Sequence, residues 1–428
     1  MTTATPPSPS THDDVDVDPV QALVAEQPRR PRRVRSRWWR IGYPIALVLL
    51  LLGIPALVFA GLRVILDSND GQLVRRVTDP AAPGYEAVVE KTPTQLVVGT
   101  KADGTLDTVT VLALTSDGVG GVMTVPATTI VPFGNMPLSL AFIHDTSGVQ
   151  PMAEALSGLL DVALTDVQVV PSAGWASTVA QVAPLTVDSP DAVTDAKGVV
   201  VFPSGPVELT ADQVAAYLSG RGARESDLNR MLRIQAFWKA WLAEVALAGA
   251  GAVPQPADVG LGRFLVDLSD DDVVFETLPV KAAAPTPAGV EQFTVDEQAA
   301  PAAIAAIIPF AEGPPGARPR LRVLDGTGQL DNGIAAAITL SAAGGQVDVV
   351  GNARDFGETT TQFVYYDEAM ESEARRLRDA LGVGEVVQSE QTNSATDLTV
   401  VLGEDYLALV GADPTTAAKP ETMSIPGG

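Results

Sequence analysis

One apolar segment limits what this chain can become. Residues 41–62, IGYPIALVLLLLGIPALVFAGL, contain no charged side chain. A helix rises about 1.5 Å per residue, so a segment of this length crosses a hydrocarbon core of roughly 30 Å. A cleaved signal peptide is the alternative, but its apolar core runs to only about 7–15 residues. The sequence therefore predicts a transmembrane helix over residues 41–63, a membrane anchor from Ile41 to Leu62.

Charges on either side of this segment predict its orientation. The segment follows a run of seven arginines and precedes only three within the next stretch: Arg29, Arg30, Arg32, Arg33, Arg35, Arg37 and Arg40 before it, and Arg63, Arg75 and Arg76 after it. Positively charged flanks stay in the cytoplasm. Residues 1–40 are thus expected to form a disordered cytoplasmic tail, and the bulk of the chain to lie outside the cell membrane.

The part of the chain beyond residue 40 is strongly acidic. It carries 21 basic and 47 acidic residues, a net charge of about −26. Nucleic-acid binding needs cations that neutralise phosphates, so this balance argues against it and against adhesion to anionic lipid headgroups. The chain has no cysteine and only two histidines, His12 and His144. A disulfide framework and a Cys or His zinc site are excluded, and a lone His144 favours a structural role over a Ser-His-Asp triad.

Residues 64–90 are expected to form a stalk, and residues 91–281 a first α/β domain. Runs at 94–100, 107–116, 120–126 and 166–171 predict strands. A helix is predicted over 145–162, with Ser147 and Gln150 as its capping box, and another from Thr210 with Gln213. Ser226 is expected to cap a long helix to about Leu247. Its apolar seam has helical spacing: Met231, Ile234, Trp238, Trp241 and Val245.

The C-terminal part shows a compact alternation of strands and helices. Residues 282–317 are expected to be a linker with one helix at 295–308. Residues 318–407 predict a smaller α/β domain built from two β-α-β units, followed by a flexible tail over 408–428. The overall class is therefore α/β: an α/β/α domain with a mixed central sheet, then a second, smaller α/β domain.

Two motifs favour a structural interpretation over a site. LDGTGQLDNG, residues 324–333, has Asp331 where a dinucleotide-binding motif needs its third glycine, so a tight turn is favoured. The acidic run around Asp270, Asp271 and Asp272 offers oxygen ligands for calcium but lacks the spacing of an EF-hand loop, which favours a solvated turn.

Arginines in residues 216–238 are the strongest chemical signal. Arg230 and Arg233 share one face of the predicted helix, and Arg221 lies in the turn before it. Together they could hold a diphosphate through charge-assisted hydrogen bonds, with Asp227 orienting Arg230. The alternative is a charged helix face with local ion pairs. Arg224 is expected to be a surface residue.

These stretches resemble the LytR-CpsA-Psr family of envelope proteins. That family carries R-x-D-T, P-R-D, Y-x-R-x-R and D-x-x-R-x-x-R-Q motifs. TLDT retains Asp107 and Thr108, VPATT retains Pro126, YLSGR retains Tyr217 and Arg221, and DLNRMLRIQ retains Asp227, Arg230 and Arg233. The chain departs from the motifs at five positions: Thr105, Ala127, Thr128, Ser219 and Ile234.

Residues 320–406 resemble the LytR C-terminal domain. Asp325, Gly326 and Thr327 stand at that family's N-G-T turn, and a helix starts at Gly333. VVGNA, FVYY and TVVLGEDY follow in the family's order. The resemblance implies a binding or accessory domain and, with the first domain, a single-pass envelope protein of a bacterium that has a peptidoglycan wall.

The resemblance implies two functional hypotheses. The first is a noncatalytic binding or regulatory member of the group, which engages a wall polymer, a polyprenyl diphosphate-linked precursor or another envelope protein. The second is an active phosphotransferase that moves a glycopolymer from a polyprenyl diphosphate carrier to peptidoglycan. Its site would contain Asp107, Arg221, Asp227, Arg230 and Arg233, with Asp107 holding Mg²⁺. Each charged hydrogen bond lost with the missing arginines costs about 1.5–3 kcal/mol, which favours the first hypothesis. Transcriptional attenuation by direct DNA contact is disfavoured by the acidic exterior.

Overall fold

The computed structural model describes residues 77–412 apart from 116–118, 196, 223–224, 271, 330–331 and 392. Within these ranges no helix is both long and apolar enough to cross a membrane. The predicted anchor from Ile41 to Leu62 and the tail over residues 1–40 lie outside the described residues.

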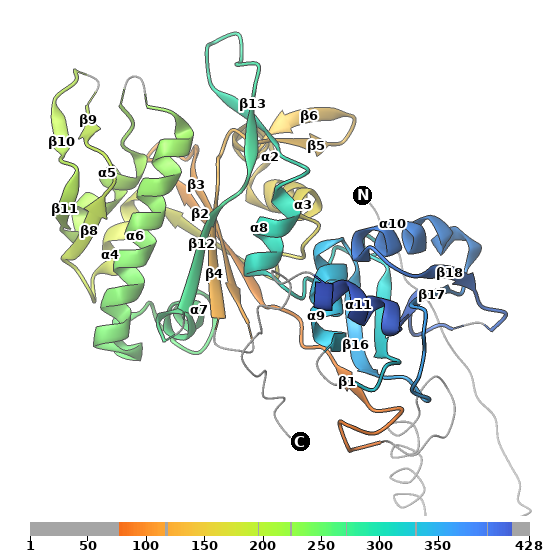
Figure 1. Ribbon diagram of the computed structural model, residues 1–428. Helices are drawn as coiled ribbons and strands as arrows, with labels where there is room; N and C mark the ends of the chain where they lie inside the picture. Colours follow the sequence, from red (N-terminus) through yellow and green to blue (C-terminus); the bar gives the residue numbers. More distant parts are fainter. Residues whose placement is uncertain are drawn as a thin grey trace, which may run out of the picture. The chain divides into compact units, whose positions relative to one another are not determined.

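A mixed sheet forms the centre of the first domain (Figure 1). Its strand order is β12 (Asp272–Thr277), β4 (Val119–Val125), β3 (Leu106–Leu114), β2 (Thr94–Thr100) and β7 (Asp166–Pro171). β3 pairs antiparallel with both β2 and β4, whereas the outer strands β7 and β12 run parallel to their neighbours. The predicted mixed α/β class is confirmed, and the four predicted strands are present with ends shifted by two residues at most.

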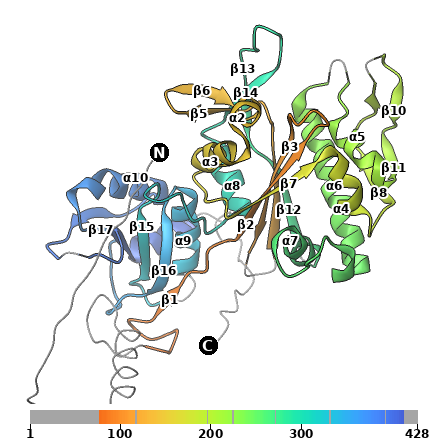
Figure 2. The same cartoon turned by 180° about the vertical axis from the view of Figure 1, so that it is seen from behind.

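Helices cover both faces of this sheet (Figure 2). One apolar core contains residues of α4 (Trp175–Val179), α5 (Val214–Ser219), α6 (Asp227–Ala248) and α7 (Gly260–Ser269). The other contains residues of α2 (Leu140–Ser147), α3 (Val149–Leu160) and α8 (Ala300–Ile307). Alternate side chains of β2 and β3 enter opposite cores, as the two-residue period of a strand requires. This gives the expected α/β/α layering.

The long helix α6 packs as its sequence predicts. Ser226 is its N-cap, and all five residues of the predicted seam are buried. Trp238 and Trp241 stack with ring centroids 5.1 Å apart, and Trp175 meets Trp241 edge-on. The capping box between Thr210 and Gln213 is also confirmed.

The helix predicted over 145–162 was wrong in its start and its cap. Ser147 ends α2, and Gly148 is the N-cap of α3 without a side-chain hydrogen bond. Gly148 has a φ of 96°, a conformation that favours glycine, so the chain turns there between two helices. Ser139, not Ser147, supplies the side-chain cap, by accepting from the backbone N–H of Phe142. α2 follows a hairpin of β5 (Ile130–Phe133) and β6 (Met136–Ser139).

The stretch predicted as a linker over 282–317 is part of the first domain's packing. β13 (Val280–Ala283) pairs with β14 (Gln292–Val295), and α8 contributes Ile307 to a core. A Cβ built on Gly121 of β4 would lie 2.1 Å from Cγ2 of Ile307. The small residue in the strand therefore lets α8 lie directly on the sheet. The sequence did not predict this contact. Ala and Ile at helical spacing are compatible with a linker helix and equally with a helix that packs on a sheet.

The C-terminal domain follows the predicted alternation closely. It contains β15 (Arg320–Asp325), α9 (Asn332–Ala342), β16 (Gln346–Asn352), β17 (Gln362–Tyr365), α10 (Glu371–Leu381), β18 (Glu385–Gln388) and β19 (Leu398–Leu402). A further helix, α11 (Glu404–Ala412), begins inside the predicted domain and extends into residues that were expected to form the tail. The sheet order is β1, β16, β15, β19, β17, β18. Strand β1 (Glu86–Val88) lies within residues 64–90, which were expected to form a stalk. This part of the stretch is instead an edge strand of the C-terminal sheet.

Candidate functional site

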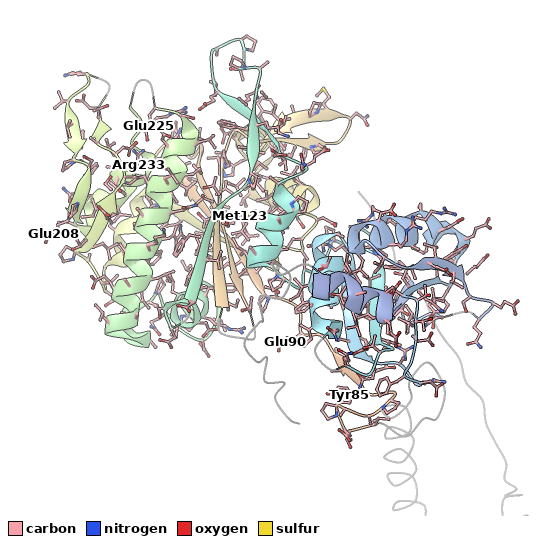
Figure 3. The ribbon with its side chains drawn as sticks, viewed as in Figure 1. Tyr85, Glu90, Met123, Glu208, Glu225 and Arg233 are labelled. Carbon is pink, nitrogen blue, oxygen red and sulfur yellow. The ribbon has the colours of Figure 1, made fainter. Side chains whose placement is uncertain are left out.

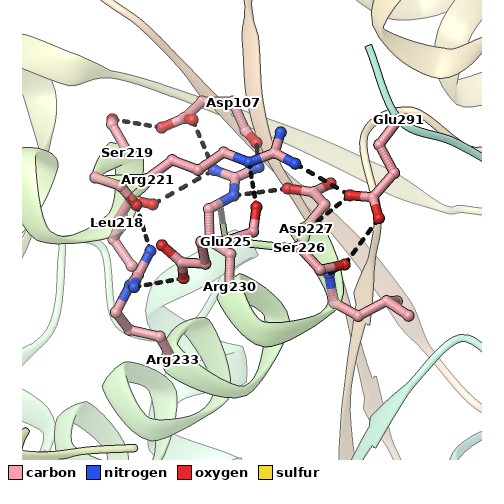
Figure 4. Close-up of polar contacts among 12 residues, drawn as sticks. Asp107, Leu218, Ser219, Arg221, Glu225, Ser226, Asp227, Arg230, Arg233 and Glu291 are labelled. Atoms are coloured by element: carbon pink, nitrogen blue, oxygen red, sulfur yellow. Dashed lines mark hydrogen bonds and ion pairs between the residues drawn. The ribbon is translucent and has the colours of Figure 1, made fainter. Parts of the chain in front are cut away.

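The structure brings together all five residues predicted for the site (Figure 4). Asp107 lies at the start of β3, and Asp227, Arg230 and Arg233 lie on the first turns of α6. Arg221 lies in the connection between α5 and α6. We call this group, with the additional carboxylates Asp191, Glu225 and Glu291, the arginine cluster.

Arg230 is held by two carboxylates inside the protein. Its Nη1 donates to Oδ1 of Asp107 at 2.8 Å, and its Nε donates to Oδ1 of Asp227 at 2.9 Å. Its Nη2 donates to the backbone oxygen of Asp107 at 2.8 Å. The residue is only 6% exposed. Burial alone would lower the pKa of Arg230, but the charges of Asp227 and Asp107 outweigh it and raise that pKa.

Asp107 uses both carboxylate oxygens within the protein. Oδ1 accepts from Arg230, and Oδ2 accepts from the Ser219 hydroxyl at 2.6 Å. A Mg²⁺ ion at Asp107 would share its carboxylate oxygens with a guanidinium and with this hydroxyl. Among the described residues, no group of three or more His, Cys, Asp or Glu side chains forms a metal-binding set. The magnesium site that the resemblance implies at Asp107 stays a prediction.

Arg233 is completely buried, and Figure 4 shows its contact with Glu225. Its Nη1 donates to Oε1 of Glu225 at 2.7 Å and to Oδ1 of Asp191 at 3.3 Å, and its Nη2 donates to the backbone oxygen of Gly220. The guanidinium carbon lies 5.9 Å from the ring centroid of Tyr217. Its two terminal nitrogens thus join α6 to the turn before it, whereas its Nε is buried without a hydrogen-bond partner among the described residues.

Arg221 lies at the surface with a side chain 39% exposed. Its Nη2 donates to Oε2 of Glu291 at 3.0 Å, and its Nε donates to the backbone oxygen of Glu225. Glu291 also accepts from the Ser226 hydroxyl and from the backbone N–H of Asp227, at 2.9 Å each. Glu291 thus caps the N-terminus of α6, where a negative charge is favourable. Arg224 lies outside the described residues.

Glu225, Asp191 and Glu291 were not predicted as part of this group. Glu225 lies two residues before α6. Its closeness in sequence to the arginines was a weak signal for an ion pair. Glu291 is separated from Arg221 by 70 positions and sits in the stretch taken for a linker. No local pattern in the sequence links the two.

The balance of charge in the cluster is negative. Three described arginines, Arg221, Arg230 and Arg233, contact five described carboxylates: Asp107, Asp191, Glu225, Asp227 and Glu291. A diphosphate entering this group would meet guanidinium groups that are already neutralised, together with an excess of negative charge. Without rearrangement, the geometry favours a structural ion-pair network over an anion-binding site.

Positions that depart from the family motifs are used for packing or hydrogen bonding. Ala127 is 6% exposed in the core beside α2 and α3, and Ile234 is 2% exposed in the core beneath α6. Thr128 is half-buried, and its hydroxyl is buried without a hydrogen-bond partner. Ser219 is half-buried and binds Asp107. By the resemblance, Ala127 and Ser219 stand where the family has arginines, Thr128 where it has an aspartate and Ile234 where it has a glutamine.

A separate cavity of about 620 Å³ does not include any residue of the arginine cluster. It is lined by residues of α3, α8 and α9, among them Leu160, Ile304 and Ala342. In the predicted turn at LDGTG, Oδ1 of Asp325 accepts from the backbone N–H and the hydroxyl of Thr327. That turn therefore closes on itself, as the tight-turn interpretation predicts.

Residues 318–406 match the family model described as LytR cell envelope-related transcriptional attenuator. The predicted resemblance of this part to a LytR C-terminal domain is confirmed. No curated protein is significantly similar to the chain in sequence.

Similar solved structures include LytR-CpsA-Psr proteins. Bacillus subtilis TagT is 18% identical with a TM-score of 0.41, over 54% of this chain and 92% of its own. A LytR-Csp2A-Psr enzyme from Actinomyces oris is 16% identical with a TM-score of 0.42, over 54% and 97%. TagT with bound octaprenyl pyrophosphate lipid is 16% identical with a TM-score of 0.40, over 54% and 92%. Identities and scores this low do not transfer an activity to this chain.

Proposed function

We propose that this protein is a membrane-anchored envelope protein that acts in cell-wall glycopolymer assembly without catalysing the transfer itself. It would be a binding or regulatory member of the LytR-CpsA-Psr group. The matched C-terminal domain, the apolar segment at Ile41–Leu62 and the arginine flank before it support placement of both domains outside the cell membrane.

The closed arginine cluster is the observation that carries the noncatalytic part of the proposal. Arg230 and Arg233 are buried, and their guanidinium groups donate to carboxylates and to backbone oxygens. Removing one partner of a buried ion pair costs about 3–5 kcal/mol, because the remaining charge is left without compensation. Binding of a diphosphate would have to offset that loss and also the repulsion from Asp107 and Asp227. The three absent arginines would have supplied further hydrogen-bond donors to stabilise a bound diphosphate.

The partners favoured by this surface are neutral or cationic parts of the envelope. A net charge of about −26 beyond residue 40 repels polyanionic polymers at long range. A peptidoglycan segment or another envelope protein with a basic face is therefore favoured over a teichoic-type polymer. A polyprenyl diphosphate-linked precursor remains the ligand of the alternative hypothesis, an active Mg²⁺-dependent phosphotransferase.

Calorimetric titration of the detergent-solubilised full chain with a polyprenyl diphosphate, with and without Mg²⁺, tests the proposal. We expect no magnesium-dependent binding. The informative variant is Arg221→Gln, because Arg221 is exposed and can be changed without opening the core. Arg263→Gln is the matched control, since Arg263 is also exposed and pairs with Asp267 on one helix.

Micromolar binding that needs Mg²⁺, disappears in Arg221→Gln and persists in Arg263→Gln would contradict the closed arginine cluster. Transfer of a polymer from the carrier to peptidoglycan in a subsequent assay, lost in the same variant, would then overturn the noncatalytic proposal. A parallel titration with soluble peptidoglycan fragments tests the binding role directly. Heat of binding that is equal in wild type and Arg221→Gln would support a binding surface away from the arginine cluster.

A further inference from the structure

The segment from Asp79 to Lys91, which we call the strap, belongs to the C-terminal domain although it precedes the first domain in sequence. Its strand β1 pairs antiparallel with β16, with Glu86 opposite Gly351 and Val88 opposite Val349. Tyr85 lies beside this sheet in Figure 3. The backbone N–H of Asn352 donates to the oxygen of Tyr85 at 2.7 Å. The edge of β16 is therefore covered by a strand from elsewhere in the chain.

Side chains of the C-terminal domain hold both ends of the strap. Nδ2 of Asn352 donates to the backbone oxygens of Pro80 and Ala82, at 2.9 Å each. At the other end, Nζ of Lys91 pairs with Oδ1 of Asp348 at 2.7 Å. These contacts extend beyond the β1 ladder in both directions, so the strap is recognised over its whole length.

A buried ion pair makes the recognition specific. Arg322 lies on the interior strand β15 and is 9% exposed. Its Nη2 forms an ion pair with Oε1 of Glu86, whose side chain is 13% exposed. Loss of the strap would take away a carboxylate that compensates a buried guanidinium, which is strongly unfavourable. An extended segment without an acid at this position would be a poorer occupant.

Gly351 shapes the docking edge. A Cβ built on Gly351 would lie 2.0 Å from the backbone oxygen of Tyr85 and 2.9 Å from Cα of Glu86. Both contacts are with backbone, which cannot turn aside as a flexible side chain can. Glycine at this position therefore permits the close approach of the strap.

The chain leaves the strap and returns from the first domain at neighbouring points. The backbone N–H of Thr92 donates to the oxygen of Phe310 at 3.1 Å, and the N–H of Phe310 donates to the hydroxyl of Thr92 at 3.3 Å. The first domain, from Pro93 to about Pro309, is thus inserted between two segments that build the C-terminal domain.

We propose that the edge of β16 is a strand-docking site whose occupant is the strap of the same chain, chosen by the Glu86–Arg322 pair and admitted by Gly351. The C-terminal domain is then a two-segment unit, and residues 318–406 alone lack its edge strand. An open edge of this kind pairs readily with other strands. The strap closes it within one chain and keeps the protein from edge-to-edge association.

Disulfide trapping in the full chain tests this proposal, because the natural sequence has no cysteine. Val88→Cys with Val349→Cys places two thiols on directly opposed residues. Val88→Cys with Glu385→Cys is the control, since Glu385 lies on β18 at the far edge of the sheet. We expect a rapid intramolecular disulfide in the first pair and at least tenfold slower formation in the control.

Two matched substitutions test the recognition. Gly351→Ala should slow trapping of the Val88–Val349 pair several-fold, whereas Gly158→Ala, with open space around its Cβ, should not. Glu86→Gln should slow trapping, whereas Glu90→Gln at an exposed position should not. Equal trapping in both cysteine pairs, or trapping unaffected by Gly351→Ala and Glu86→Gln, would overturn the proposal. Disulfides formed mainly between chains would replace it with strand exchange between two copies.

Discussion

The contacts of Arg230 bear on whether the arginine cluster binds a ligand or stabilises the fold. Its guanidinium spans Asp107 of β3 and Asp227 of its own helix, with Leu218 and Asp107 backbone oxygens completing the set. The spacing of Arg230 and Arg233 in the sequence is equally compatible with diphosphate binding and with ion pairs. In the structure both arginines are paired with carboxylates, which supports the second role in our proposal.

Arg230→Met should lower the free energy of unfolding by about 3–5 kcal/mol, because it leaves Asp107 and Asp227 buried without their cation. Asp107→Asn should also destabilise, and the double variant should lose less than the sum of both. Urea unfolding followed by tryptophan fluorescence measures this, since Trp238 and Trp241 lie on the same helix. Arg263→Gln, at an exposed pair, should change stability by less than about 1 kcal/mol. Additive losses in the double variant would contradict the pairing.

We expect Asp397 to make the stability of the C-terminal domain depend on pH in the acid range. Burial alone would raise the pKa of Asp397, but hydrogen bonds and charge from Arg320 outweigh it and lower the pKa below its ordinary 3.8. A lowered folded-state pKa contributes stability that is present above 3.8 and is lost as the pH falls through the folded value. Asp397→Asn should therefore flatten the fall in stability below about pH 4. Urea midpoints measured from pH 3 to pH 7 test this, and an unchanged slope would contradict it.

Elements of the first domain are positioned by contacts that skip long stretches of sequence. α8 lies on β4 because Gly121 leaves room for Ile307, and the start of α6 is capped both by Ser226 and by Glu291. Composition around residues 282–317 indicates a linker, yet the contacts there stabilise the sheet and the cluster. The packing role of these elements therefore depends on their contacts with residues distant in the sequence.

Gly121→Ala should destabilise the first domain by about 1–3 kcal/mol, since the added methyl overlaps Ile307. Adding Ile307→Ala to Gly121→Ala should cost less than the two single losses combined, because the new methyl fills part of the vacated space. Thermal unfolding by circular dichroism measures the cycle. Gly158→Ala is the control and should be neutral or slightly stabilising in its helix. A loss in Gly158→Ala as large as in Gly121→Ala would refute the contact.

The whole molecule carries a formal charge of −24. In the part of the chain that the structure describes, most basic side chains form ion pairs, such as those at Arg230, Arg318 and Arg320. Self-repulsion of the remaining acids opposes the compact state. This surface also limits the partners available to the protein in the envelope.

Raising NaCl from about 10 mM to about 150 mM shortens the Debye length from about 30 Å to about 8 Å and should raise the unfolding midpoint. Differential scanning calorimetry measures the midpoint, with KCl at the same ionic strength as the control for ion-specific effects. A falling midpoint would show that screened surface ion pairs outweigh the repulsion.

The sequence by itself determined the strand and helix alternation of the C-terminal domain, the buried seam of α6 and the gathering of arginines at the start of that helix. These features follow from local periodicity and caps, which depend on residues a few positions apart. Only the tertiary structure decided that Glu291 and Asp107 neutralise those arginines, and that Glu86 meets Arg322. An ion pair between residues 70 or more positions apart depends on the folded path of the chain, and no local pattern records that path.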